Sequence, residues 1–152
     1  MSDLTTEQAA RRHWMGVLAR ATAPALREAW ESAPARPDYS YLRRPETGLA
    51  LVRGRAGGSG QRFNLGEMTV TRCSVRLADG TVGHAYIAGR DSAKAEHAAL
   101  LDALLQDPAR RDAIEAKVVA PLAEAQAEAR SQQSARAESS RVEFFTMVRG
   151  DG

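Results

Sequence analysis

Apolar residues recur at helical spacing near the start of the chain. They stand at Ala10, Trp14, the adjacent Val17 and Leu18, and Ala21, so that each is three or four positions from another. The preceding TTEQ, residues 5–8, matches a capping box, in which a hydroxyl and an amide side chain satisfy free backbone groups at a helix start. Pro24 predicts the start of a second short helix that carries Leu26 and Trp30 on one side. The proline-containing stretch ESAPARPD, residues 31–38, ends this helical section.

The pattern changes at Tyr39 to short extended runs. These are YSYLRR, TGLALVRG and the longer EMTVTRCSVRL, which glycine and proline separate, and they predict antiparallel strands. Asp79-Gly80 suits the positive backbone angles of a tight hairpin turn. With two central residues in that turn, the facing pairs are Leu77 with Val82, Val75 with His84, and Cys73 with Tyr86. One hairpin face is then apolar, and the other carries Arg72, Ser74 and Arg76.

A second helical section follows Gly89. Asp91 or Ser92 caps a helix that we expect to run to about Gln106 and to cover the sheet. Its apolar stripe consists of Ala93, His97, Leu100, Leu101 and Leu104. We expect Asp102 and Gln106 to lie opposite this stripe.

Asp107-Pro108 predicts the start of another helix. Ile114, Val118 and Leu122 follow at four-residue steps, and Pro121 should bend or interrupt the helix. Residues 123–140 are prone to form a helix but almost lack large apolar side chains. Such a segment buries little of itself, so we expect a solvated helix or an arm that extends away from the domain.

These patterns predict an α+β fold with N-terminal helices, a central antiparallel β-sheet with a tight hairpin, C-terminal helices and an extended docking tail. The 152 residues, 43% hydrophobic and 26% charged, fit one domain. Its sections are a helical part at 1–38, strands at 39–88, a helical part with a polar arm at 89–140, and the tail at 141–152.

Composition narrows the function classes. The chain has no apolar run long enough for a membrane helix and no signal peptide at its start, so we expect a cytoplasmic protein with no membrane partner. A lone cysteine, Cys73, excludes an internal disulfide. The formal charge of +2 and an aromatic content of 5% do not favour nucleic-acid binding, although a small nucleic-acid-binding protein stays as a second alternative function.

The stretch RGRAGGSGQR, residues 53–62, is a candidate phosphate-binding loop. Glycines let backbone N–H groups approach an anion, and arginines supply charge-assisted hydrogen bonds. The candidate residues are Arg53, Arg55, Gly57, Gly58, Gly60 and Arg62. The stretch lacks the lysine and Ser/Thr of a Walker A loop and is not an intact GxGxxG, so a flexible connection between two strands is the alternative.

No catalytic set is evident, and the catalytic residues are unknown. His13, His84 and His97 have no metal-ligand spacing, so we expect no metal site. His97 is expected to be packed, whereas His84 lies near several arginines and is the better functional candidate. Cys73 alternates with apolar residues and is expected to be buried. Glu67 and Glu96 are unpaired carboxylates, so the chain alone does not resemble a complete enzyme.

The end of the chain, RVEFFTMVRGDG, holds two of the three phenylalanines. We predict that it docks on a partner protein through Phe144, Phe145, Met147, Val148 and Arg149, because the polar arm before it offers little to pack against. The alternative is that this segment returns as an added strand on the protein's own sheet.

Five stretches together resemble one family. They are WMGVLA at Trp14, ETGLALV at Glu46, GGSG followed by RFNLGEMTVTRC, GRDSAKAEHAALLDALL at Gly89, and the closing RVEFFTMVRGD. In this order, and over nearly the whole chain, they resemble the PhnG family, a subunit of the bacterial carbon–phosphorus lyase core complex for phosphonate degradation.

The resemblance implies a cytoplasmic subunit that forms a hetero-oligomer with the other core proteins. With them it supports transfer of a phosphonate such as methylphosphonate onto the ribose of ATP with loss of adenine, giving α-D-ribose 1-methylphosphonate 5-triphosphate. ATP is then a co-substrate of the complex, and this chain binds no cofactor of its own. The subunit is expected to be inactive alone. The main alternative is a purely structural scaffold subunit whose arginines form salt bridges to other subunits and contact no substrate.

Overall fold

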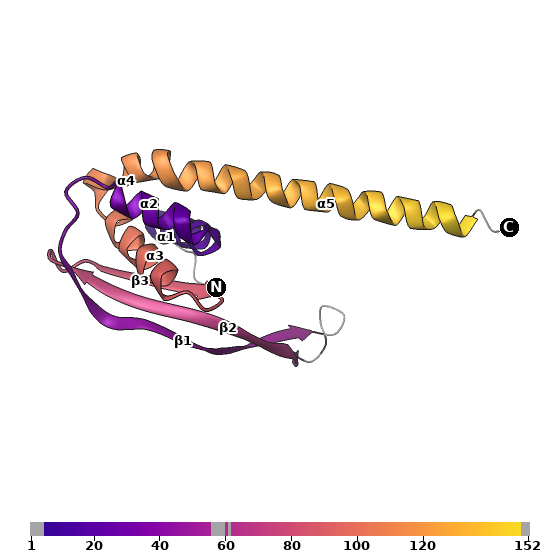
Figure 1. The fold of residues 1–152 in the computed structure, drawn as a ribbon, viewed down its shortest axis with the longest axis horizontal. Helices are drawn as coiled ribbons and strands as arrows, with labels where there is room; N and C mark the ends of the chain where they lie inside the picture. Colours follow the sequence, from indigo (N-terminus) through magenta and orange to yellow (C-terminus); the bar gives the residue numbers. More distant parts are fainter. Residues whose placement is uncertain (1–4, 56–59, 61, 150–152) are drawn as a thin grey trace.

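The computed structural model describes residues 5–55, 60 and 62–149, with side chains described for 5–54, 60 and 66–140. Its elements in chain order are α1 (Thr6–Arg20), α2 (Ala23–Glu31), β1 (Tyr39–Arg55), β2 (Arg62–Leu77), β3 (Val82–Ala88), α3 (Ser92–Leu105), α4 (Pro108–Ile114), the π-helix η2 (Glu115–Val119) and α5 (Ala120–Arg149). The described helices lie over one face of an antiparallel sheet with strand order β1-β2-β3 (Figure 1). The predicted α+β class is confirmed.

The first two helices begin where the sequence predicts. The Thr5 hydroxyl accepts a hydrogen bond from the Gln8 backbone N at 3.1 Å, and the Gln8 side chain accepts one from the Thr5 N at 3.0 Å. Thr22 caps α2, whose Leu26 and Trp30 are buried as expected. The capping signals in the sequence therefore set both helix starts.

The hairpin between β2 and β3 differs from the predicted register. The Leu77 N donates to the Thr81 carbonyl at 2.8 Å, which closes a loop of three residues rather than two. Gly80 takes a φ of +93°, and the Asp79 carboxylate accepts from the Thr81 N at 2.8 Å. The extra loop residue shifts every facing pair by one position.

The observed pairs in this hairpin are Cys73 with Ala85, Val75 with Gly83, Ser74 with His84, and Arg72 with Tyr86. The predicted pairs were therefore wrong, and His84 and Tyr86 lie on the exposed face rather than the apolar one. The apolar face of β2 was predicted correctly, since Cys73, Val75 and Leu77 are all buried.

Helix α3 lies at the centre of the core. Asp91 caps it and Gln106 ends it, as predicted, and its leucines pack against the sheet. It approaches β3 so closely that a Cβ at Gly83 would stand 2.1 Å from the Ala99 carbonyl oxygen. The prediction that Asp102 lies opposite the apolar stripe was wrong, because its side chain is fully buried.

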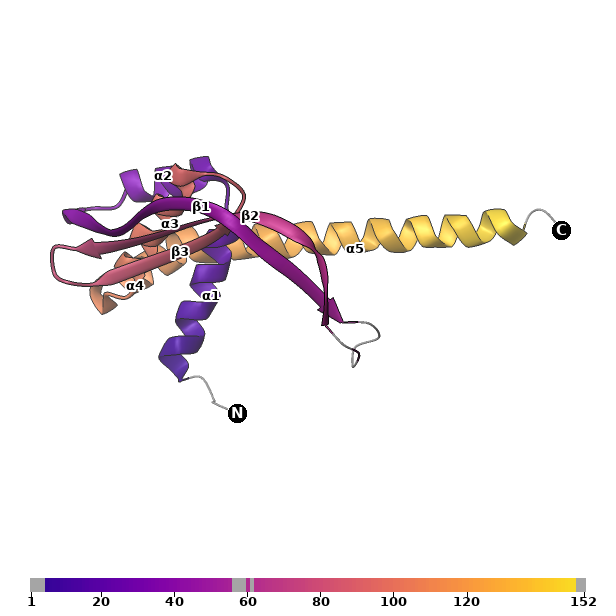
Figure 2. The ribbon, with the colours of Figure 1, turned by 90° about the horizontal axis from the view of Figure 1, so that it is seen from below.

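Helix α5 follows the π-helix η2, which marks the interruption expected near Pro121. The wider π turn accommodates the hydrogen bond that a proline cannot donate. Both views show α5 projecting well beyond the domain (Figures 1 and 2). The chain is helical as far as Arg149, so the expected extended tail was wrong for 141–149, and those residues add no strand to the sheet.

No described helix combines the length and apolarity that crossing a lipid bilayer requires.

Candidate functional site

The sheet face that points away from the helices carries a polar cluster. His84 on β3 lies opposite Ser74 on β2, and the Ser74 Oγ is 2.8 Å from the His84 Nδ1. Arg72 and Tyr86 form the next pair along the same two strands. The alternation of strand side chains places all four on one face, because their buried neighbours point to the other.

Glu46 on β1 ties two arginines together on this face. Its Oε2 is 3.0 Å from the Arg43 Nη1 and 3.6 Å from the Arg72 Nη2. About half of each of these side chains is exposed, so water screens the ion pairs strongly. One carboxylate faces two guanidinium groups, which leaves the cluster with a net positive charge.

The Ser74 and His84 contact does not amount to a catalytic relay. Among the described residues, the carboxylate bonded to His84 is that of Asp102, which accepts from the His84 backbone N at 2.9 Å and not from its ring. A serine nucleophile needs a base whose second ring nitrogen is held by an orienting group. This geometry supports binding rather than covalent catalysis.

The Cys73 thiol and the Glu96 carboxylate are both held in unreactive states. Burial raises the pKa of the Cys73 thiol to about 11, so it is protonated and a poor nucleophile at neutral pH. Tyr39 and Tyr41 both donate to the Glu96 Oε1. Burial and this carboxylate raise the pKa of Tyr39, and the hydrogen bond to Glu96 is the main cause of the raised pKa of Tyr41. Glu96, a candidate base in the sequence, is therefore occupied by two tyrosines.

Within the described side chains, no group of three or more His, Cys, Asp or Glu residues is placed to hold a metal ion.

The predicted phosphate-binding stretch lies at the tip of the long hairpin of β1 and β2. Arg53 is exposed on β1 and pairs with Asn64, and the register places Arg55 opposite Arg62. Gly60 is exposed in the connection. Gly57 and Gly58 lie outside the described residues, and so do the side chains of Arg55 and Arg62. Figure 1 shows the hairpin extending past the helices that cover the rest of the sheet.

The same hairpin exposes large apolar side chains whose exposure the sequence pattern does not indicate. Leu49 is 69% exposed, Leu51 is 53% exposed and Met68 is 39% exposed. The two leucines alternate with Gly48 and Ala50, a pattern that an ordinary core strand also shows. They are exposed because the helices cover only the other end of the hairpin.

The predicted docking residues Phe144, Phe145, Met147, Val148 and Arg149 all belong to α5, and their side chains lie outside the described part. Residues 131–140, which precede them, are exposed throughout, as expected of a solvated helix. Partner docking therefore stays a prediction, now for a helical segment.

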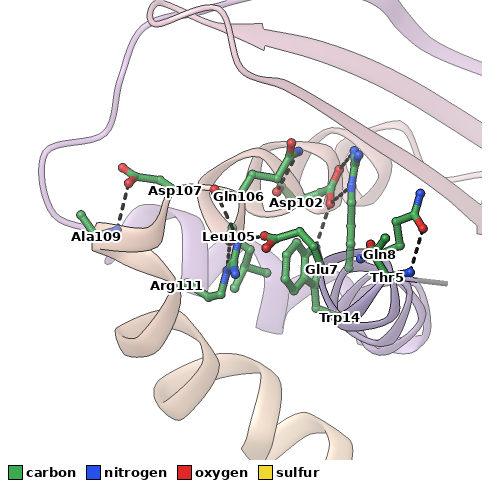
Figure 3. A network of polar contacts seen from close by, with 11 residues as sticks. Thr5, Glu7, Gln8, Trp14, Asp102, Leu105, Gln106, Asp107, Ala109 and Arg111 are labelled. Atoms are coloured by element: carbon green, nitrogen blue, oxygen red, sulfur yellow. Dashed lines mark hydrogen bonds and ion pairs between the residues drawn. The ribbon is translucent and has the colours of Figure 1, made fainter.

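Asp102 and its partners form the main buried polar network, which the sequence did not reveal (Figure 3). Its Oδ2 is 2.8 Å from the Arg11 Nη2, and its Oδ1 accepts from the Trp14 Nε1 at 2.8 Å. The hydrogen bond to Asp102 raises the pKa of Arg11. Every oxygen of this carboxylate has a partner, so the network stabilises the contact of α1 with α3 and leaves no free group for catalysis.

Comparison with known proteins places these features in context. The model of the family described as phosphonate metabolism protein PhnG matches residues 9–150. The chain is also 48% identical over 145 residues to the alpha-D-ribose 1-methylphosphonate 5-triphosphate synthase subunit PhnG of Rhizobium meliloti (strain 1021). That alignment covers 94% of this chain and 91% of its relative.

Proposed function

Because the chain belongs to the PhnG family, we propose that it is an accessory subunit of an α-D-ribose 1-methylphosphonate 5-triphosphate synthase. The observation that carries this proposal is the 48% identity to a subunit of that name over nearly the full length of both chains. The assembled complex transfers methylphosphonate onto the ribose of ATP with loss of adenine. ATP enters as a co-substrate, and the complex works in the cytoplasm.

The accessory role accords with the chemistry of the described side chains. Cys73 is protonated, Glu96 is engaged by two tyrosines, and no carboxylate among the described side chains contacts the His84 ring. Displacement of adenine requires groups that activate a nucleophile and a leaving base. We therefore assign those groups to partner subunits of the hetero-oligomer.

The hairpin tip is one part of this chain that we assign to substrate anions. Arg55 and Arg62 are directly opposite one another in the register, and like charges in that relation destabilise a strand pair. A bound phosphate or phosphonate removes the penalty and accepts hydrogen bonds from both guanidinium groups. Arg53 adds a third positive charge on the same hairpin.

A purely structural role is the second candidate. Leu49 and Leu51 expose apolar surface on the same hairpin, and such surface is typical of a protein interface. In that case, the hairpin arginines form salt bridges to another subunit and do not reach the substrate.

Assembly and activity of the complex with arginine variants distinguish substrate binding from a purely structural role. The subunit is co-expressed with its partners, and adenine release from ATP and methylphosphonate is measured for Arg55→Ala and Arg62→Ala. Substrate binding predicts intact assembly with activity reduced about 10- to 100-fold, since each charge-assisted hydrogen bond is worth roughly 1.5–3 kcal/mol. Arg27→Ala, an exposed arginine on α2, is the matched control. Variants that fail to assemble, while any assembled fraction keeps full activity, support the structural role.

A further inference from the structure

A second basic surface lies between α1 and the first turns of α5. It is a hollow of about 450 Å³ that comes from different elements than the hairpin tip. The residues that line it are Arg12, His13, Gly16, Val17, Arg20, Ala123, Gln126 and Arg130. Three guanidinium groups and an imidazole therefore share one concave surface, and the lining includes no carboxylate.

Helical spacing creates this hollow. Arg12, Gly16 and Arg20 recur every four residues on one face of α1, and Ala123 and Arg130 lie on the facing side of α5. The two helices are held together there by the Gln126 side chain, whose Nε2 donates to the Val17 carbonyl at 3.0 Å.

One of the guanidinium groups lies over Gly16. A Cβ built at Gly16 would stand 3.4 Å from the Arg20 Nη1, so the Arg20 side chain folds back along α1 over the glycine. The missing side chain thus leaves room for a guanidinium group within the hollow. A larger residue at this position would occupy the same space.

No described carboxylate balances the charges in this hollow. Arg12, Arg20 and Arg130 form no ion pair with any residue whose side chain the structure describes. Arg11 and Arg111 nearby do have carboxylate partners, namely Asp102 and Glu7. Unpaired like charges around one concave surface raise the local potential and attract anions.

We infer that this hollow binds the polyphosphate chain of a small-molecule ligand. Its volume falls in the range of small-molecule sites, and guanidinium groups bind phosphate through paired hydrogen bonds. Several separated cations suit a chain of phosphates better than a single phosphate. The choice of a triphosphate rests on the proposed function, whose substrate and product both carry one.

Binding to the isolated full-length protein tests this site. Inorganic tripolyphosphate and ATP are titrated calorimetrically, and both should bind, whereas adenosine should not. Arg20→Ala and Arg130→Ala should each weaken tripolyphosphate binding about 10-fold, through loss of charge-assisted hydrogen bonds. Arg27→Ala, which lies outside the hollow, should bind like the unaltered protein.

Gly16→Gln provides a second variant that keeps every charge. It fills the hollow, favours the helix and should abolish tripolyphosphate binding without lowering the melting temperature. Unchanged affinity in all three hollow variants, or no binding by the unaltered protein, would overturn the inference. A third outcome would also overturn it: the unaltered protein does not bind tripolyphosphate, and the hollow variants no longer co-purify with the partner subunits. The hollow would then receive an acidic protein segment. Failure of the proposed function is separate, since it is measured as adenine release by the complex.

Discussion

The indole Nε1 of Trp14 donates a 2.8 Å hydrogen bond to the Asp102 carboxylate, and both side chains are fully buried. This bond joins α1 to α3 across 88 positions of sequence. Arg11 neutralises the same carboxylate from the protein surface. One charged residue of α3 therefore contributes to the attachment of the N-terminal helix, beside the apolar packing of Trp14 and Leu18.

Replacing Asp102 should therefore destabilise the fold. Asp102→Ala leaves the Trp14 indole N–H and the His84 backbone N–H without their acceptor, so we expect a loss of about 3 kcal/mol in the free energy of unfolding. Urea denaturation measures this loss. Asp112→Ala, an exposed acid on α4, is the control and should change stability by less than about 0.5 kcal/mol. A similar small effect for Asp102→Ala would contradict the structural role.

Gly83 should tolerate no side chain. In Gly83→Ala the new Cβ would meet the Ala99 carbonyl oxygen at 2.1 Å and the Ala103 Cβ at 2.8 Å, so α3 must move away from β3. We expect a cost of about 2–3 kcal/mol in the free energy of unfolding, as for other overpacked cores. Gly48→Ala is the matched control on β1, because its new Cβ would have no neighbour within 4 Å. Equal stabilities for the two variants would show that α3 does not pack as described.

Alkaline pH should weaken the fold. Burial raises the pKa of Cys73 from 9.0 to about 11, so the unfolded chain loses this proton before the folded chain does. The contribution is fully present below pH 9 and is lost as the pH rises through about 11. The raised pKa values of Tyr39 and Tyr41 act in the same direction. Urea unfolding at intervals from pH 8 upward should show this decline, and Cys73→Ala should make it shallower; a slope unchanged by that substitution would exclude Cys73 as a contributor.

Local signals in the sequence predicted much of the fold. Four helices are capped by a side chain that accepts a hydrogen bond from a backbone N–H a few residues ahead; the capping residues are Thr5, Thr22, Asp91 and Asp107. Their starts could therefore be predicted from neighbouring residues. The hairpin register could not be predicted. Asp79-Gly80 suits both two-residue and three-residue loops, and the choice shifts every pair on β3.

The burial of Asp102 and the hollow between α1 and α5 depend on residues distant in sequence. Arg11 is 91 positions from Asp102, and Gln126 is 109 positions from Val17. A charged residue on a helix is expected to be exposed unless its partner is known. The arginines at the hairpin tip could be identified from the sequence because they flank a glycine-rich stretch, whereas those of the hollow are spread over two helices.

The exposed leucines of β1 should matter for assembly rather than for folding. The double variant Leu49→Ser, Leu51→Ser removes apolar surface that is already more than half exposed, so the isolated protein should melt within a few degrees of the unaltered one. Its affinity for partner subunits should fall about 10-fold or more, as expected when apolar side chains leave an interface. Co-purification on a tagged partner measures this. Leu100→Ser is the contrasting variant, since that leucine is buried and its loss should unfold the protein.

The last turns of α5 should attach this subunit to its partners. The helix leaves the domain, and residues 131–140 are exposed, so Phe144 and Phe145 follow a segment that makes no core of its own. Burying two phenylalanine side chains on a partner contributes roughly 3–6 kcal/mol before ordering costs. A protein lacking residues 141–152 should therefore melt near the temperature of the intact chain when isolated.

The same truncated protein should no longer co-purify with the complex. Phe144→Ala with Phe145→Ala should reproduce that loss in a full-length chain, because those two side chains are the largest apolar groups in the deleted segment. Glu128→Ala with Glu138→Ala, two exposed acids on the polar part of α5, is the matched control and should leave assembly intact. If truncation instead lowers the free energy of unfolding of the isolated protein by about 3 kcal/mol or more, the phenylalanines belong to its own core and the docking prediction is wrong.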